Sequence, residues 1–360
     1  PRADTTFAEE SVDKCIAPNI ITDLTGVHLV GSVTSFENYA ECQLRYFLRY
    51  GLDLREREEF TFSPVNFGVV LHAVIKEVCD EIKKNGESFY LISEQKRRAM
   101  VEKSVEAITD IYQNSILKDS NRNEFMVKRM GDLADRTLWA MGQQLKDGDF
   151  VPVAFEHKFS MEIGESDNKQ MMSGTIDRID MCEDADNVYV RIIDYKTGKK
   201  DFNLTKTYYG IDIQLMVYME AAMRLAAKMR PDKTIVPAGV FYYNISDPIV
   251  SASNDTEEEI EDKIKEELRL KGMVNSDKDI AVRMDSTEGT SLSIPVSRKA
   301  DGSFDSRRSR IMSTEQFTML GKYVDIKAVD TAGRILDGSI ERNPYRDGQF
   351  SSCDRCPYNA

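Results

Sequence analysis

Two aspartates and a lysine carry the strongest chemical signal in the sequence. Asp177 belongs to the motif G-x-x-D-R-x-D over 174–180, and Asp194 and Lys196 belong to D-Y-K-T-G over 194–198. Period-two alternation puts Asp194 and Lys196 on one face of a strand, one turn away from the strand of Asp177. Paired carboxylates hold hard divalent cations, and a cation held there polarises a phosphate and activates water. A neighbouring ammonium stabilises the negative charge that develops in phosphodiester hydrolysis.

A structural salt bridge is the alternative interpretation of so short a motif. An Asp–Lys pair at a strand end needs no catalytic role, and Asp177 would then lie in a turn. Three further residues bear on the choice. His72 lies on a helix, away from its apolar stripe, and Gln214 and Tyr218 lie four residues apart on another helix. Taken singly, they would be a structural or exposed histidine, a surface glutamine and a packed tyrosine.

Hydrophobic periodicity predicts the elements that position these residues. Helical spacing recurs before the motifs over 34–50, 66–84, 94–117 and 124–145. Strand alternation follows over 151–163, 170–182, 187–195 and 234–244. A helix over 205–229 separates the last two strands. We therefore predict an α/β protein with a mixed central sheet flanked by helices.

The remainder of the chain predicts a helical extension. A capping box, Thr256-x-x-Glu259, predicts the start of a helix that Lys271-Gly272 would end. Residues 275–310 are polar and are predicted to form a loop or short hairpin. A last helix is predicted over 314–338. We predict a lead-in segment over 1–33 and one domain over 34–360. The parts of that domain are a helical block (34–148), a catalytic core (149–245), an insertion (246–312) and a C-terminal helix with a cysteine tail (313–360).

Composition excludes several classes of protein. The 360 residues are 41% hydrophobic and 30% charged, which rules out collagen, low-complexity disorder and a disulfide-rich miniprotein. No apolar run approaches the roughly 18 residues of a membrane span, and the first residues form no secretory signal. We expect a cytoplasmic protein with reduced cysteines, cut from a longer chain because it lacks an initiator methionine.

The charge excludes a broadly basic protein that coats duplex DNA. The formal net charge is −13, although an acidic enzyme can still carry a locally basic groove. Four lysines flank the motifs and predict such a local basic rim, namely Lys158, Lys199, Lys200 and Lys206.

The order of these motifs resembles the RecB-like branch of the PD-(D/E)xK nuclease superfamily. The resemblance rests on G-x-x-x-H, G-x-x-D-R-x-D, D-Y-K-T-G and Q-x-x-x-Y, although Ile176 stands where the superfamily name has proline. It implies a restriction-endonuclease-like core and a DNA exonuclease dependent on Mg²⁺ or Mn²⁺. The metal ligands it implies are His72, Asp177, Asp194 and the Tyr195 carbonyl. It further implies Lys196 as the catalytic lysine, with Gln214 and Tyr218 as supporting residues. Glu156 is a further acidic candidate.

Cysteines narrow the resemblance to the nuclease domain of the AddB family, which forms one of the two subunits of ATP-dependent helicase–nucleases. Cys42 precedes the core, and Cys353 and Cys356 follow it as C-x-x-C. The fragments F-Y-Y-N-I-S-D-P over 241–248 and N-P-Y over 343–345 agree. In that family one early and three late cysteines hold a [4Fe–4S] cluster. The third late cysteine is missing before Ala360, so we expect an absent or incomplete cluster and a loose tail.

The same resemblance implies a biological role. It predicts cutting of single-stranded ends or unwound duplex DNA at double-strand breaks, beside an AddA-like helicase subunit and away from membranes. No P-loop motif occurs in the sequence, so ATP-driven translocation would belong elsewhere. Two alternatives stay open: a catalytically silent clamp for DNA or the partner, and a stand-alone RecB-like exonuclease of CRISPR adaptation. Intact Asp177, Asp194 and Lys196 disfavour the clamp, and the insertion disfavours the stand-alone enzyme.

Overall fold

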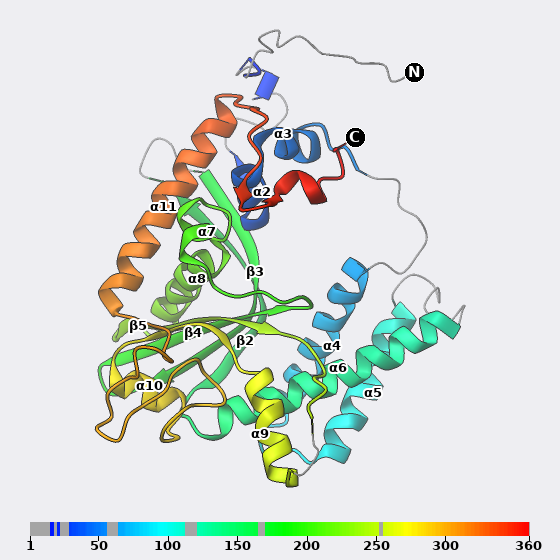
Figure 1. Ribbon diagram of the computed structural model, residues 1–360, viewed down its shortest axis with the longest axis vertical. Helices are drawn as coiled ribbons and strands as arrows, with labels where there is room; N and C mark the ends of the chain where they lie inside the picture. The colour runs from blue at the N-terminus through cyan, green and yellow to red at the C-terminus, as the bar shows by residue number, and fades with distance from the viewer. Residues whose placement is uncertain are drawn as a thin grey trace.

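A seven-stranded mixed sheet lies at the centre of the fold (Figure 1). The computed structural model describes residues 15–17, 20–21, 29–55, 64–111, 121–164, 170–251 and 255–359. The strand order is β1-β3-β4-β5-β6-β7, with β2 paired to β3. The strands are β1 (Val30–Ser32), β2 (Val151–Ile163), β3 (Gln170–Glu183), β4 (Asn187–Lys196), β5 (Thr234–Asn244), β6 (Lys271–Asn275) and β7 (Ile311–Met312). This arrangement confirms the predicted α/β class with a mixed central sheet.

Strand β3 connects the parts of the sheet. It pairs antiparallel with β2 along its length, parallel with β1 near its start and antiparallel with β4 near its end. Strand β4 then pairs in parallel with β5, and α8 (Gln214–Met229) provides the crossover between them. Val188 to Tyr195 are all buried, as expected for a strand that is covered on both faces.

Helices cover both faces of the sheet, which accounts for the two apolar cores. Alternation along β4 sends Ile193 into a core with α4 (Pro64–Lys84), α5 (Glu94–Ile111) and α6 (Asn121–Lys146). The preceding Ile192 enters the opposite core, which contains residues of α2 (Val33–Glu41), α8 and α11 (Thr314–Leu336). Helices α4, α5 and α6 of the predicted helical block therefore lie on the face of the sheet opposite to α11, whereas α2 lies on the same face as α11 (Figure 1).

Two predicted helices are interrupted. The helix expected over 34–50 is divided into α2, α3 (Gln43–Tyr46) and a π-helical turn over Phe47–Gly51, because Cys42 is extended with φ −169°. The helix expected over 205–229 is divided into α7 (Leu204–Tyr208) and α8, with Gly210 between them at φ +80°. Only glycine adopts that conformation without strain. Residues 112–117 of the helix predicted over 94–117 lie outside the described residues.

The predicted insertion contributes to the sheet. Helix α9 (Glu257–Glu267) begins at the Thr256 capping box as predicted, but Lys271 and Gly272 belong to β6 and do not end the helix. A Cβ atom on Gly272 would lie 1.9 Å from the Val240 carbonyl oxygen, so close strand approach requires this glycine. Helix α10 (Lys278–Met284) lies within 275–310, which was expected to be loop or short hairpin, and β7 follows directly after that region.

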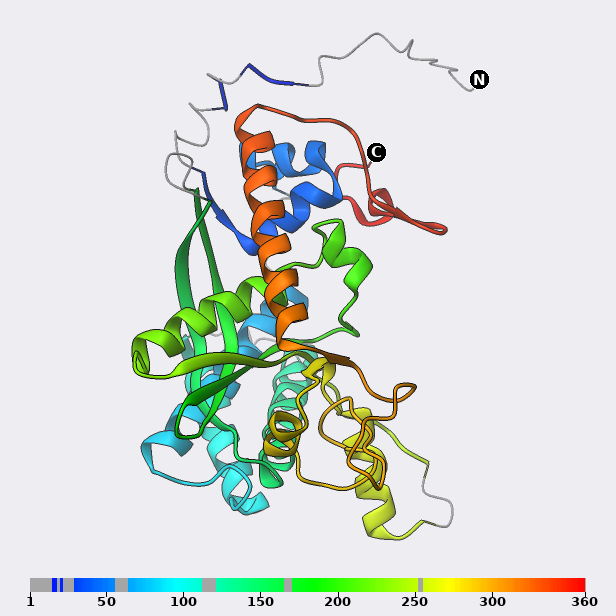
Figure 2. The same ribbon diagram turned by 90° about the vertical axis from the view of Figure 1, so that its left-hand side faces the viewer.

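The C-terminal tail packs against the N-terminal helices, contrary to the expectation of a loose tail (Figure 2). The tail contains β8 (Arg346–Asp347), β9 (Phe350–Ser351) and a 3₁₀ helix over Ser352–Arg355. Tyr345 donates its N–H to the Glu41 carbonyl at 2.8 Å and accepts the Ser352 N–H at 2.9 Å. These backbone bonds join the tail directly to α2.

Length and hydropathy also bear on membrane insertion. Among the described residues, no helix is both long enough and apolar enough to cross a membrane.

Candidate active site

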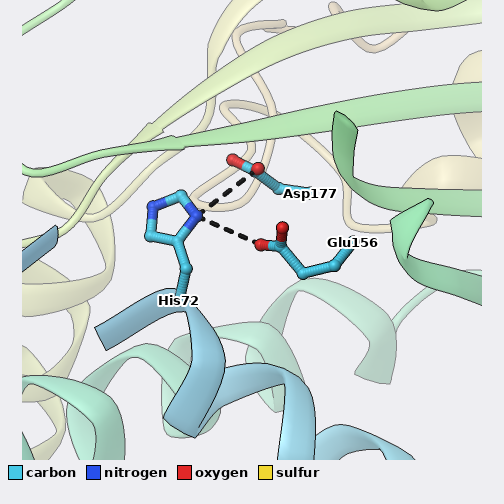
Figure 3. Close-up of side chains that lie close together, drawn as sticks. All are labelled: His72, Glu156 and Asp177. Atoms are coloured by element: carbon cyan, nitrogen blue, oxygen red, sulfur yellow. Dashed lines mark hydrogen bonds and ion pairs between the residues drawn. The ribbon is translucent and has the colours of Figure 1, made fainter. Parts of the chain in front are cut away.

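One histidine and two carboxylates converge at the sheet (Figure 3). His72 Nδ1 lies 3.2 Å from Glu156 Oε1 and 3.4 Å from Asp177 Oδ1. The three side chains come from α4, β2 and β3, and their ligand atoms all lie within 4.8 Å of one another. Carboxylate oxygens suit Mg²⁺ and Mn²⁺, and imidazole nitrogen suits many first-row metals. The donor set therefore fits a divalent cation.

Glu156 occupies this site at an energetic cost. Its φ is +47°, a left-handed conformation that costs of order 1–3 kcal/mol in a residue other than glycine. The register pairs Phe155 with Arg178 and His157 with Ile176, so Glu156 lies opposite Asp177. Like charges opposite each other in a sheet are destabilising. Strain and repulsion meet at one cross-strand position, as is typical of functional sites.

His72 balances the two carboxylates. Burial disfavours its charged form, but the hydrogen bonds to Asp177 and Glu156 outweigh burial and raise the pKa of His72 to about 10. The carboxylates of Asp177 and Glu156 therefore strongly attract positive charge at the position where the metal was predicted. A metal ion bound at His72 would have to displace the imidazole proton.

Asp194 and Lys196 form a second, adjoining part of the site. Lys196 Nζ lies 2.6 Å from Asp194 Oδ2, and Asp194 is only 2% exposed. Burial, with the nearby charge of Asp177, raises the pKa of Asp194 to about 7. Asp177 Oδ2 in turn accepts the N–H of Tyr195 at 2.5 Å, which links β3 to β4. Within the described part of the chain, the group of ligand atoms within 4.8 Å contains His72, Glu156 and Asp177 but not Asp194, whose carboxylate is paired with Lys196.

Gln214 and Tyr218 extend from the lysine in a hydrogen-bonded chain. Lys196 Nζ donates to Gln214 Oε1 at 2.9 Å, and Gln214 Nε2 donates to the Tyr218 hydroxyl at 2.8 Å. Both residues lie on the first turns of α8, next to the end of β4. The lysine ammonium is therefore held from two sides, by a carboxylate and by an amide.

Sequence reasoning missed a partly buried carboxylate next to this hydrogen-bonded chain. Glu37 of α2 accepts the N–H groups of Ile213 and Gln214 at 2.9 and 3.0 Å, and so caps the start of α8. Burial, opposed by the charge of Lys200, raises the pKa of Glu37 to about 7. In the sequence, a glutamate in the first half of a helix looks like ordinary dipole compensation. The available signal was its position beside Phe36, on the apolar side of the helix.

Lys200 and Asp212 were not identified as a pair either. Lys200 Nζ lies 3.0 Å from Asp212 Oδ1, and the same oxygen accepts the Tyr242 hydroxyl at 2.5 Å. Sequence alternation cannot find this pair, because the two residues lie in the irregular segment between β4 and α8.

Only two of the four lysines predicted to form a basic rim line the same cleft. Lys199 and Lys200 line a cleft of about 890 Å³, where Arg129 and Lys271 add further positive charge. Lys158 and Lys206 do not line this cleft. Three carboxylates also line it, those of Asp201, Asp247 and Glu267. The cleft is therefore mixed in charge, with its lysines next to Thr197 and Gly198 at the end of β4.

The tail brings the predicted cluster cysteines toward one end of the molecule. Cys42 is buried, Cys353 and Cys356 are partly exposed, and all three are free thiols. The backbone of Tyr345 bonds to both Glu41 and Ser352, the residues that precede Cys42 and Cys353. The same hydrogen bonds therefore join the segments that carry Cys42 and Cys353.

Comparison with known proteins agrees with this arrangement. A profile described as PD-(D/E)XK nuclease superfamily matches residues 31–360. A Thermoanaerobacter sp. protein, named as the B-type subunit of an ATP-dependent helicase/deoxyribonuclease, is 34% identical over 91% of this chain and 29% of that protein. Proteins of the same name from Lachnoclostridium phytofermentans (33% identity, 98% of this chain, 31% of that protein) and Clostridium acetobutylicum (34%, 94% and 30%) are also similar. The chain thus spans about three tenths of the length of these curated relatives.

Proposed function

The chain belongs to the PD-(D/E)XK nuclease superfamily, and on that premise we propose that it is a metal-dependent deoxyribonuclease domain that hydrolyses DNA phosphodiester bonds. The observation that carries this proposal is the convergence of His72, Glu156 and Asp177 beside the Asp194–Lys196 pair. A purely structural salt bridge would need neither the strained Glu156 nor a histidine between two carboxylates.

His72, Glu156 and Asp177 would hold Mg²⁺ or Mn²⁺, with Asp194 and the Tyr195 carbonyl as the remaining ligand candidates. When bound, such a cation supplies Lewis-acid charge and lowers the pKa of water. The protein's own contribution is to fix these oxygen and nitrogen atoms on three elements of one rigid sheet-and-helix unit. This rigidity limits the reorganisation needed at the reacting phosphate.

Lys196 would stabilise charge and would not act as a base. Burial lowers its pKa, but Asp194 and other carboxylates outweigh burial, so that the net shift of the Lys196 pKa is upward. The ammonium therefore stays protonated near neutral pH. Gln214 and Asp194 hold it in one position, where it can donate to a phosphate oxygen or to the attacking water.

The names of the relatives support a wider proposal. We propose that the chain is the nuclease part of an ATP-dependent helicase–nuclease that acts exonucleolytically on DNA at double-strand breaks, with an AddA-like helicase as its partner. Cys42, Cys353 and Cys356 would supply three ligands of a [4Fe–4S] cluster that joins the tail to α2.

A cleavage assay on end-labelled single-stranded DNA tests the activity. We expect degradation with Mg²⁺ or Mn²⁺, none with EDTA, and loss of cleavage in Asp177→Asn. DNA binding without cleavage under all metal conditions would favour the silent clamp. Co-purification with a helicase subunit separates the helicase–nuclease assignment from the stand-alone exonuclease, which would be isolated without one.

A further inference from the structure

Two neighbouring tyrosines are exposed on the segment that connects Lys196 to Gln214, where they contact α11 and, through Tyr345, the C-terminal tail. Tyr208 ends α7 and is 59% exposed, and the adjacent Tyr209 is 51% exposed. Helix α7 lies alongside α11 in both views, and Tyr323 of α11 contacts Tyr208 (Figure 2). We call Tyr208, Tyr209 and Tyr323 the tyrosine platform. Exposed aromatic clusters of this kind are typical of binding surfaces.

The rings of the platform are held in place. Tyr208 and Tyr323 are stacked, with ring centroids 5.5 Å apart and an interplanar angle of 6°. Tyr209 meets Tyr208 edge-on at 5.2 Å, and the Tyr323 hydroxyl donates to the Tyr208 carbonyl at 2.7 Å. A hollow of about 420 Å³ is lined by the three tyrosines with Leu204, Thr205 and Leu320. A flat ligand would therefore meet aromatic surface that is already ordered.

The position of the platform connects it to the active site. The segment that carries Tyr208 and Tyr209 begins after Lys196 and ends at Gln214, and these two residues are hydrogen-bonded to each other. The platform therefore lies on the chain segment that joins two residues of the candidate site. Lys206 lies on α7 itself, and Lys199 and Lys200 lie at the start of the segment.

The charge of this segment favours a nucleic acid over an acidic protein surface or an apolar ligand. The segment between Lys196 and Gln214 carries three lysines and two aspartates. Both aspartates are in ion pairs, Asp201 with Arg310 and Asp212 with Lys200, which leaves Lys199 and Lys206 as the lysines whose charge these pairs do not offset. Aromatic rings beside lysines are the combination with which proteins bind single strands without sequence preference.

We propose that the tyrosine platform binds bases of single-stranded DNA by stacking, and so holds the strand next to the site of cleavage. The inference rests on the proposed nuclease function for the identity of the ligand. Tyr208 and Tyr209 would supply the exposed ring faces, and Tyr323 would brace Tyr208 from behind. Duplex DNA would gain little from the platform, because its bases are already stacked on one another.

Binding measured in EDTA tests the platform separately from catalysis. The probes are a fluorescent thymidine oligonucleotide and a strand of equal length and charge made of abasic sites. We expect Tyr208→Ala and Tyr209→Ala each to weaken binding of the thymidine strand about fivefold or more. Binding of the abasic strand should be unchanged, and Tyr208→Trp should retain the affinity of the wild type.

Salt dependence and a matched control sharpen the test. Loss of stacking should leave the slope of log affinity against log salt unchanged, whereas loss of a phosphate contact reduces that slope. Tyr90→Ala is the control, because Tyr90 is 48% exposed in the helical block and lies outside the platform. Thermal melting of each variant verifies that it is folded.

Two results would overturn the proposal. Platform variants that bind both strands as the wild type does would show that the rings do not contact bases. Variants that bind DNA normally but no longer associate with a helicase subunit would identify the platform as a protein interface. A chain that never cleaves DNA, yet loses thymidine-strand binding in these variants, would overturn the proposed nuclease function and leave the platform standing.

Discussion

Glu37 and Gln214 are 177 residues apart in the sequence and are joined at 3.0 Å by a hydrogen bond from the Gln214 N–H to the Glu37 carboxylate. Through this bond, α2 caps the helix whose first side chain contacts Lys196. Helix α2 ends at Glu41, where the tail is bonded through Tyr345. The cysteine-bearing end of the molecule is therefore connected to the candidate catalytic lysine by one short helix.

Glu37→Ala should reduce nuclease activity more than it reduces stability. Loss of the cap costs about 1 kcal/mol of folding free energy, as for other helix N-caps, and it frees the first turn of α8 to shift Gln214. Glu37→Gln keeps an acceptor oxygen and should restore most of the activity. Cleavage rates and melting temperatures of the two variants check this prediction. Equal rates in Glu37→Ala and the wild type would separate the cap from catalysis.

Stability should depend on pH through the same residue. Burial raises the pKa of Glu37 from an ordinary 4.5 to about 7, with Lys200, Asp212 and Lys196 nearby. In the unfolded chain this carboxyl group loses its proton near pH 4.5, whereas in the folded protein it keeps the proton until about pH 7. The contribution of Glu37 to the free energy of unfolding is therefore complete below about pH 4.5 and declines as the pH rises toward 7. Glu37→Gln lacks this decline. Urea unfolding of both proteins between pH 4.5 and 8 should give a difference that grows with pH and levels off above about 7.

The sheet was predictable because its strands are long and regular. The bounds of β2 and β5 match the alternation in the sequence, and those of β3 and β4 differ by a single residue. The errors fall where tertiary contact overrides local pattern. Gly210 breaks a continuous amphipathic helix through its positive φ, and Gly272 is explained by the approach of Val240 and not by a helix end.

The sequence predicted the site residues that lie in short motifs, but not those that reach the site only through tertiary packing. Asp177, Asp194, Lys196, Gln214 and Tyr218 share short motifs, and the structure brings them into one connected region. Glu156 was only a weak candidate, because no motif surrounds it and its left-handed backbone has no counterpart in the sequence. Glu37 contacts the site from a distant helix, which spacing cannot reveal.

Lys196→Ala should remove most of the cleavage while leaving metal binding intact. The lysine pairs with Asp194 and is outside the His72, Glu156 and Asp177 group, so its loss removes no ligand atom from that group. Loss of one preorganised donor typically costs about 10²-fold or more in turnover. Single-turnover cleavage and Mn²⁺ titration of the variant give the two quantities. Unreduced cleavage would exclude a catalytic role for Lys196.

Iron uptake should depend on a further thiol. Cys42, Cys353 and Cys356 provide three thiolates, and a [4Fe–4S] cluster generally takes four. With three of these thiolates alone, we expect the 360-residue chain to take up iron only weakly on anaerobic reconstitution. Cys42→Ser should abolish the iron uptake that remains. Equal iron uptake by Cys42→Ser and the wild type would refute the assignment of these cysteines as cluster ligands.

Glu156 offers a matched pair of substitutions that separates strain from chemistry. Glu156→Ala removes the carboxylate but keeps a side chain at φ +47°, whereas Glu156→Gly removes both the carboxylate and the strain. Both variants should lose metal affinity and cleavage, because one of three converging ligand groups is gone. Both also end the repulsion between Glu156 and Asp177, so that their difference in stability reports the backbone alone. We expect Glu156→Gly to be more stable than Glu156→Ala by about 1 kcal/mol, measured by urea unfolding in EDTA. Equal stability would mean that the left-handed conformation costs nothing at this position, and full cleavage by either variant would exclude Glu156 from the site.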